Sequence, residues 1–204
     1  MVDEGYILLK SGELFLRYGI KSVNMDDIAR HLAVSKKTIY QFISDKNQII
    51  EKFVSYYLGD KTCKVCDIVE KSSNVLEELY HTSIMMKEMI NSINPTMLYD
   101  LKKYHPKAWD MYQSHRRTVL EKQIVDSLER GKNEGFFRKD INSRILARLR
   151  VEMIDLAFNP DVFDSKEFNI TDVHMQFFDN FIYGLLTVKG HKIFNDFKQI
   201  IEEE

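Results

Sequence analysis

Apolar residues recur with the period of an α-helix along almost the whole chain, and polar turn residues separate the helical segments. In the first sixty residues, one apolar stripe ends at Gly19, a second begins after Asn24 and a third begins after Ser35. Asn and Ser are favoured helix N-caps, and glycine is favoured just after a helix. The pattern therefore predicts one helix, two short helices joined by a tight turn, and a longer helix.

The rest of the chain continues this pattern. We expect helices over residues 74–90, 96–104, 106–132, 143–158 and 171–188. Pro95 and Pro106 lie just before or at helix starts and Gly135 lies at a helix stop, where these residue types are tolerated. The fold class expected from the pattern is all-α, with about nine helices.

Composition and charge exclude several classes of protein. Hydrophobic residues make up 44% of the 204 residues and prolines number 3, which is typical of a soluble helical protein. The net charge of -2 excludes a polybasic nucleic-acid coat. The strongest apolar run, residues 181–188, is too short to span a bilayer, and the first residues show no secretory signal. With two cysteines, a reducing, cytoplasmic location is expected.

The two short helices predict a helix-turn-helix. Ile28, Leu32, Val34 and Ile39 have the spacing to pack the two helices together, which leaves the outer face of the second helix free to enter a major groove. Residues 17–46 carry six Lys or Arg against three Asp, a local net charge of +3 in an otherwise acidic chain. This local charge favours binding to nucleic acid.

The outer face of the second helix carries donors, cations and an aromatic hydroxyl, and no carboxylate. Its expected DNA-contacting positions are Ser35, Lys36, Lys37, Thr38, Tyr40 and Gln41. Each has an alternative role: the lysines as a solvated face, Tyr40 as a half-buried packing residue, and Ser35 as a cap. Asn24 is likewise expected first as a cap and second as a phosphate contact.

One ordered stretch of the sequence runs from Tyr18-Gly19-Ile20 through Asn24-Met25-Asp26-Asp27-Ile28-Ala29 and Ala33-Val34-Ser35-Lys36-Lys37-Thr38-Ile39-Tyr40 to Ser44-Asp45-Lys46. This stretch resembles the TetR family of bacterial transcriptional regulators. The resemblance implies a three-helix DNA-binding domain over residues 1–46 and a helical ligand-binding and dimerisation domain over residues 47–204. It also implies that Tyr40 and Lys46 contact phosphates, that Thr38 contacts backbone or base, and that Lys36, Lys37 and Gln41 face the groove.

Two positions depart from the family pattern. The family often has glycine in the turn where this chain has Ala33, and an alanine held at positive φ costs roughly 1 kcal/mol or more. The family often has an aromatic residue at the position of Ile43, whereas here Phe42 precedes it. The spacing makes Ile39 and Phe42 the apolar positions of this helix, and the departure leaves its core partner open.

A homodimer is expected because one helix-turn-helix reads only a few base pairs, and two must be spaced by about 34–36 Å to read successive grooves. The last predicted helix is apolar over so much of its circumference that it needs two buried sides. The expected interface residues are Met153, Phe177, Phe181, Gly184, Leu185 and Val188. The resemblance implies a four-helix bundle here, and the alternative is that both helices only fill the monomer core.

The middle of the chain is rich in methionine and aromatic residues, which adapt to irregular apolar shapes. A pocket for a largely apolar or aromatic small molecule is expected there, with ordinary core as the alternative. The candidate ligand-binding residues are Met85, Met89, Tyr104, Trp109 and Tyr112. His81, His105 and His115 are candidate polar contacts within such a pocket.

Cys63 and Cys66 form a single Cys-x-x-Cys pair, for which inert reduced thiols are expected and a redox switch is the alternative. No metal, cofactor or catalytic motif is expected. The overall prediction is a transcriptional repressor that binds an operator in double-stranded DNA and leaves it when a small molecule binds, with no membrane partner. The alternatives are a helical binding protein whose helix-turn-helix no longer reads DNA, and an enzyme acting through Tyr112 or His115.

Overall fold

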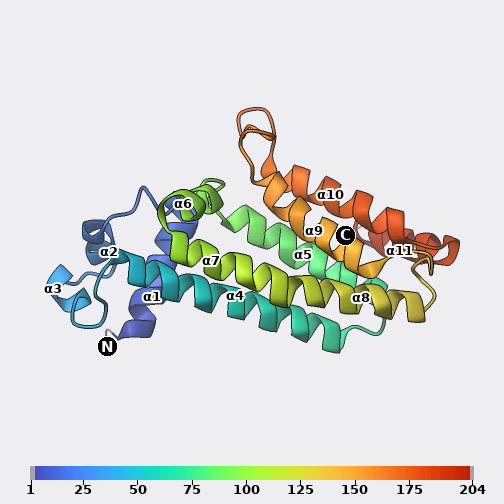
Figure 1. Cartoon of the computed structure of the whole chain (residues 1–204), viewed down its shortest axis with the longest axis horizontal. Coiled ribbons are helices and arrows are strands. Elements are labelled where there is room, and N and C mark those ends of the chain that lie inside the picture. Colours follow the sequence, from blue (N-terminus) through green and yellow to red (C-terminus); the bar gives the residue numbers. More distant parts are fainter. Residues whose placement is uncertain (1–2, 203–204) are drawn as a thin grey trace. The chain divides into compact units, whose positions relative to one another are not determined.

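The computed structural model describes residues 3–202, and the side chains of residues 3–197. This part of the chain is built from helices α1 to α11, with an isolated β-bridge between Phe137 and Leu186 and no extended strand (Figure 1). The predicted all-α fold class is confirmed. The helices form two compact units. The first contains the residues up to Lys61 and residues 91–115, and the second contains residues 62–90 and those from Arg116 onward.

The first unit contains the predicted helix-turn-helix. Its helices are α1 (Glu4–Tyr18), α2 (Met25–His31), α3 (Lys36–Ile39), the first part of α4 (Lys46–Lys71), α6 (Met97–Tyr104) and α7 (Pro106–His115). Gly19 ends α1 with a φ of 80°, as predicted, and its N–H donates to the carbonyl of Phe15. Pro106 occupies the first position of α7, where its missing N–H costs no hydrogen bond.

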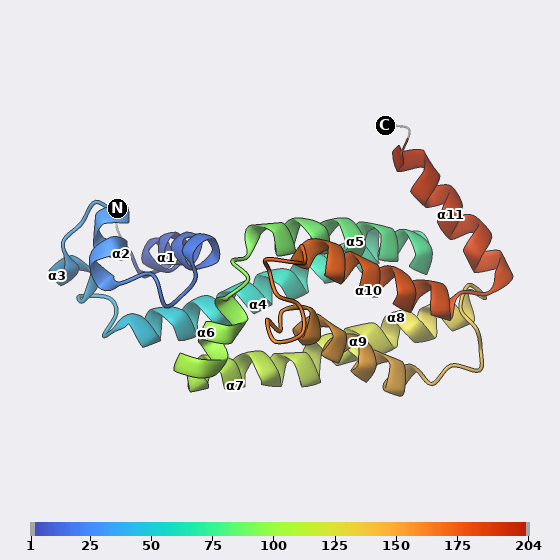
Figure 2. The same ribbon diagram turned by 90° about the horizontal axis from the view of Figure 1, so that it is seen from above.

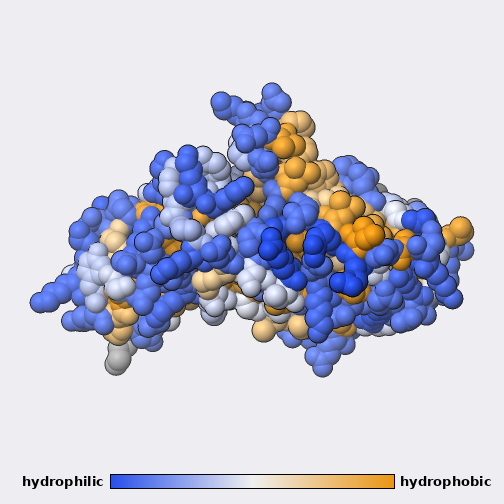
Figure 3. All heavy atoms as spheres, in the orientation of Figure 1, coloured by the Kyte–Doolittle hydropathy of each residue, from blue (hydrophilic) through white to orange (hydrophobic). Residues whose placement is uncertain are grey.

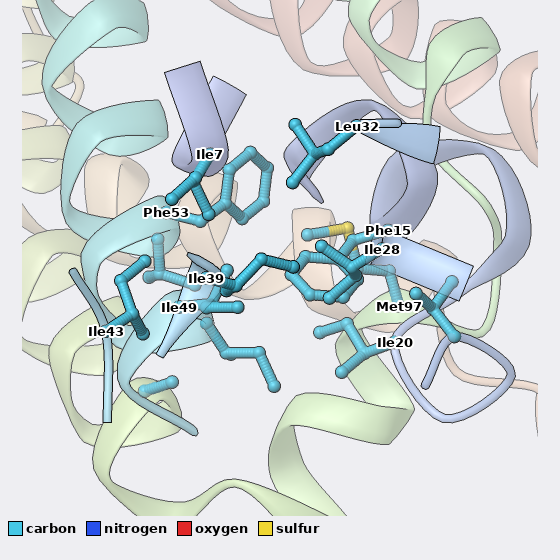
Figure 4. Close-up of a cluster of buried hydrophobic side chains, with 14 of the residues drawn as sticks. Ile7, Phe15, Ile20, Ile28, Leu32, Ile39, Ile43, Ile49, Phe53 and Met97 are labelled. Carbon is cyan, nitrogen blue, oxygen red and sulfur yellow. The ribbon is translucent and has the colours of Figure 1, made fainter. Parts of the chain in front are cut away.

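The core of this unit joins α1 to α4 with α6 and α7. Figure 4 shows Phe15 next to Ile28 and Phe53 next to Ile7, within a cluster that also contains Met97 from α6. The rings of Phe15 and Phe53 meet edge to face at 6.0 Å. Every cluster member is less than a tenth exposed, so this apolar core fixes how α2 and α3 are held.

The boundary between the compact units differs from the expected domain boundary after residue 46. α4 continues without a break from the first unit into the second, and residues 91–115 return to the first unit. The reason is that Met97, Leu101 and Ala108 complete the core around α1. That residues 1–46 form the DNA-binding domain therefore remains a prediction about function.

The second unit is a set of longer helices, which Figure 2 shows from above. They are the second part of α4, α5 (Val75–Ser92), α8 (Glu121–Asn133), α9 (Ser143–Ala157), α10 (Ile170–Leu185) and α11 (Val188–Glu202). The helix predicted over residues 106–132 is divided by a π-helical turn, Arg116–Leu120. None of the helices within residues 3–202 has the length and apolarity that crossing a membrane would need.

The helix predicted over residues 171–188 ends earlier, at Leu185, and α11 follows it. The carbonyl of Leu185 accepts the N–H of Arg138, and the N–H of Thr187 donates to the carbonyl of Phe136. The hydroxyl of Thr187 then accepts the N–H of Gly190, which caps the new helix. These contacts with a distant segment hold the chain where α10 ends and α11 begins.

The turn between α2 and α3 holds Ala33 at a φ of 54°. The N–H groups of Ala33 and Val34 donate to the carbonyls of Arg30 and Ala29, which closes α2. A left-handed alanine is strained because its Cβ approaches the following carbonyl oxygen. The turn therefore keeps the geometry for which the resembled family often uses glycine.

The second unit buries an imidazole and a guanidinium close together. His174 is 1% exposed on α10 and its ring lies 4.6 Å from the ring of Phe158. Burial lowers the pKa of His174 to about 4, with a further contribution from the positive charge of Arg150. His174 is therefore neutral in the folded protein across the physiological range.

We predict that Ala33→Gly stabilises the protein by about 0.5 kcal/mol, because relief of left-handed strain exceeds the extra chain entropy of glycine. Ala33→Val is the matched opposite and lowers stability, since a β-branched residue fits positive φ worse than alanine. Urea unfolding measures both. A loss of roughly 1 kcal/mol in Ala33→Gly, the usual cost of glycine, contradicts a left-handed turn.

We predict that His174 makes the protein less stable in mild acid. The pKa of a histidine in the unfolded chain is near 6.5, whereas that of folded His174 is about 4. The contribution of His174 to the free energy of unfolding is therefore fully present above pH 6.5 and is lost as the pH falls toward 4. Between pH 7 and pH 5 the wild type should lose about 2 kcal/mol more than His174→Leu. His81→Leu, at an exposed position, is the control, and identical pH profiles for wild type and His174→Leu contradict the assignment.

Candidate DNA-binding site

The two short helices begin at polar side chains that cap them. The side chain of Asn24 accepts the N–H groups of Asp26 and Asp27, and the carboxylate of Asp27 accepts the N–H of Asn24 in return. The hydroxyl of Ser35 accepts the N–H of Thr38 at 3.0 Å and lies 2.9 Å from its hydroxyl. Both residues are therefore caps, as the sequence predicts.

α3 is held by one buried side chain and presents its other residues outward. Ile39 is fully buried in the cluster that contains Ile28 and Leu32 (Figure 4). Val34 packs against the same cluster while remaining partly exposed. The packing predicted for the two helices is present, and it leaves the opposite side of α3 accessible.

The accessible side of α3 carries the predicted cations and hydrogen-bonding groups. Lys36, Lys37 and Gln41 are exposed, Tyr40 is 48% exposed, and Thr38 is half-buried. Lys36 forms an ion pair with Asp26 at 2.8 Å, and this hydrogen bond raises the pKa of Lys36. Lys37 makes no ion pair within the described part of the chain. These five side chains are all at least partly accessible on α3 and the turn after it, and their contact with a DNA groove remains a prediction.

Lys46 lies differently from the other predicted contacts. It is the first residue of α4, yet its ammonium group donates to the carbonyl of Ile20 at 2.6 Å. Burial lowers the pKa of Lys46, against the opposing effect of Asp100 and Asp27. A phosphate contact by Lys46 remains a prediction, and in the free protein this side chain instead joins α4 to the loop before α2.

The core partner of α3, which the sequence pattern leaves open, is Ile43 and not Phe42. Ile43 is 1% exposed, whereas Phe42 is 40% exposed. Ile43 follows Ile39 by four residues and its N–H donates to the carbonyl of Ile39 at 3.1 Å, so the i+4 position rather than the i+3 position faces the core. The aromatic ring therefore joins the outward surface beside Gln41, which sequence periodicity missed.

The predicted dimer residues divide into accessible and inaccessible ones. Met153, Phe177 and Phe181 are half-buried and Gly184 is exposed. Val188 is 89% exposed at the start of α11, whereas Leu185 is 2% exposed and lies in the core of its own unit.

A further apolar surface lies on the outer face of α9. Ile145 is 64%, Leu149 49% and Leu156 41% exposed. Figure 3 shows apolar side chains gathered over α9, α10 and the loop between them. The apolar spacing of Ile145, Leu149, Met153 and Leu156 makes α9 the second helix of the pair that is the expected interface, and that interface remains a prediction.

The candidate ligand-binding residues belong to both compact units. Met85 and Met89 are half-buried on α5 in the second unit. Tyr104, Trp109 and Tyr112 belong to the first unit, where the rings of Trp109 and Tyr112 lie 5.4 Å apart. Trp109 packs against the apolar core, while Tyr104 is 40% exposed. A shared ligand site for these residues remains a prediction.

The histidines and cysteines show no constellation of their own. Burial lowers the pKa of His105 and of His115, and His81 borders a groove of about 310 Å³ between α4 and α5, next to Met85. Cys63 and Cys66 are exposed free thiols. Among the described residues, no three His, Cys, Asp or Glu side chains are placed to hold a metal ion.

Comparison with known proteins agrees with this geometry. Residues 7–53 match the family model described as bacterial regulatory proteins, tetR family. The HTH-type transcriptional regulator YvaF of Bacillus subtilis is 35% identical over 104 residues, which span 50% of this chain and 54% of that protein. The HTH-type transcriptional repressor KstR2 of Mycobacterium tuberculosis is 22% identical over 151 residues, 71% of this chain and 74% of that protein.

The fold is shared with a solved transcriptional regulator of the TetR family from Agrobacterium tumefaciens. The TM-score is 0.73 at 16% identity, and the alignment covers 89% of this chain and 96% of the other. The curated relatives are regulators, which supports the prediction of a regulator rather than an enzyme. The helix-turn-helix sequence, its matching family model and the shared fold agree: residues 7–53 match the tetR family of bacterial regulatory proteins, and the chain shares the fold of a solved regulator of that family.

Proposed function

We propose that this protein is a dimeric transcriptional repressor that binds operator DNA through α3 and is released by a small molecule. The observation that carries the proposal is the outward face of α3, where Lys37, Tyr40 and Gln41 are exposed on a helix fixed by the buried Ile39. Cations and amide or hydroxyl groups are the side chains that contact phosphates and base edges. The partial match to KstR2, which is named a repressor, supports repression rather than activation.

Dimerisation follows from the requirement for two recognition helices. The outer face of α9 offers Ile145, Leu149 and Leu156, which lie on one side of the helix and are each more than 40% exposed. Apolar side chains grouped in this way are stabilised when a partner removes them from water. A second copy of the chain, pairing through α9 and α10, would cover this surface and place two copies of α3 on one duplex.

Release by a ligand requires that the ligand bind two conformations unequally. The second unit is the proposed site of this binding, because its helices carry methionines and buried polar groups around a core. A ligand that favours a spacing of the two α3 helices other than one helical turn lowers the population competent to bind DNA. The ligand is proposed to be largely apolar.

We predict that Lys37→Ala and Tyr40→Phe weaken DNA binding and leave the fold and dimer unchanged. Genomic fragments selected by the wild-type protein supply the operator for titration. Lys37→Ala should weaken affinity about tenfold and reduce the salt dependence by about one counterion. Lys87→Ala, which removes an exposed lysine from α5, is the control of equal charge. Unchanged affinity in both α3 variants instead favours a helical binding protein that does not read DNA.

We predict that Leu149→Asp converts the dimer to a monomer, because a carboxylate at the centre of an apolar interface is desolvated without a partner. Analytical ultracentrifugation measures the mass, and operator affinity should fall at least tenfold with it. Leu9→Asp, at a position 50% exposed on α1, introduces the same charge at matched exposure (49% for Leu149) and should remain dimeric. A dimeric Leu149→Asp variant rules out this face as the interface.

A further inference from the structure

The second unit balances most of its buried charges within itself. The guanidinium of Arg116 lies 2.7 Å from the carboxylate of Asp155 and 2.9 Å from the carbonyl of Val151. The carboxylate of Glu78, 3% exposed, lies 3.1 Å from Arg130. Pairing of this kind is expected, since an unpaired charge in a protein interior is costly.

Arg150 is the exception. This residue of α9 is 5% exposed, and no carboxylate within the described residues lies in ion-pair distance of it. Its Nη2 reaches only the thioether sulfur of Met86 at 3.1 Å, which is a weak acceptor. Its Nη1 is buried without any acceptor among the described residues. Burial lowers the pKa of Arg150 to about 10, so the guanidinium remains charged at neutral pH.

His174 adds a second group without a partner beside it. Neither ring nitrogen of His174 meets a hydrogen-bonding group among the described residues. Because this imidazole is neutral, it offers one N–H donor and no charge. His174 and Phe178 are four residues apart on α10 and so share a face of that helix, and the guanidinium of Arg150 lies over the ring of Phe178 at 5.3 Å. The two buried groups with unused donors, one of them charged, are therefore neighbours.

The side chains around these donors are apolar and adaptable. The guanidinium lies over the ring of Phe178 at 5.3 Å, and Phe158 contacts the ring of His174. Met86, only 8% exposed, holds the one sulfur contact of Arg150 with a flexible side chain that other rotamers can move aside. The surroundings therefore suit an apolar molecule with a single polar group directed at Arg150.

We infer that Arg150 and His174 recognise the carboxylate of an otherwise apolar small molecule, and that this carboxylate completes the hydrogen bonding of both side chains. A planar guanidinium matches a carboxylate through two parallel N–H···O bonds. One positive charge neutralises one carboxylate, whereas a phosphate dianion would retain a buried negative charge. The inference rests on the proposed function, since it gives the chemical class of the releasing ligand.

The test is the thermal unfolding of the full chain in carboxylate-free buffer, without DNA. The probes are straight-chain carboxylates from butanoate to decanoate and their phenyl-substituted counterparts, each paired with the alcohol of the same carbon skeleton and with the alkyl phosphate. At a probe concentration near a hundred times Kd, the unfolding midpoint should rise by about 5 °C or more for at least one carboxylate. The matched alcohol and phosphate should shift it far less.

The variants separate recognition from a structural role. Arg150→Met, which removes a buried charge and keeps the length, should unfold at the same or a higher temperature and lose the carboxylate response. Arg150→Lys should keep the charge and weaken carboxylate binding about tenfold, because a lysine ammonium lacks the two parallel N–H donors of the guanidinium. Arg148→Gln, on the exposed side of the same helix, should respond as wild type does.

Three results would overturn the inference: no carboxylate shifts the wild type, the alcohols or phosphates act as strongly, or Arg150→Met responds like wild type. A marked fall in the stability of Arg150→Met also contradicts it, by assigning the guanidinium a structural role. Failure of the proposed function is seen separately, as absent DNA binding by a chain that still responds to carboxylates.

Discussion

The burial of Ile39 against the core shared by Ile28 and Leu32 is the constraint on which the candidate site depends. α3 has four residues, far fewer than an isolated helix needs in water, so its conformation comes from packing and from the Ser35 cap. Because one side of such a short helix is fixed in the core, the opposite side is defined as well. The outward placement of Lys37, Tyr40 and Gln41 is a consequence of what the helix buries.

Local signals in the sequence predicted the elements that local physics controls. Asn24 and Ser35 are caps, Gly19 adopts positive φ, and Ile28 and Ile39 are buried, each as the pattern indicates. Ala33 adopts positive φ without being glycine, because tertiary packing of α2 on α3 outweighs its strain. The fold class and the outward placement of the polar side chains of α3 were therefore accessible from residue type and spacing.

Features that depend on distant segments were not predicted. The chain at the end of α10 is held by hydrogen bonds with residues near Phe137, a distant segment whose position the periodic pattern does not reveal. The register after α3 places Ile43, four residues after Ile39, rather than Phe42 in the core. The ammonium of Lys46 binds the carbonyl of Ile20, a contact that the spacing of cations along the chain does not reveal.

The central claim is that two copies of α3 enter successive major grooves of one duplex. Dimethyl sulfate footprinting of the selected operator tests this directly, because the reagent methylates guanine N7 in the major groove. The account predicts two protected patches on one face of the DNA, with centres about one helical turn apart. A single patch, or protection with no such spacing, would contradict it.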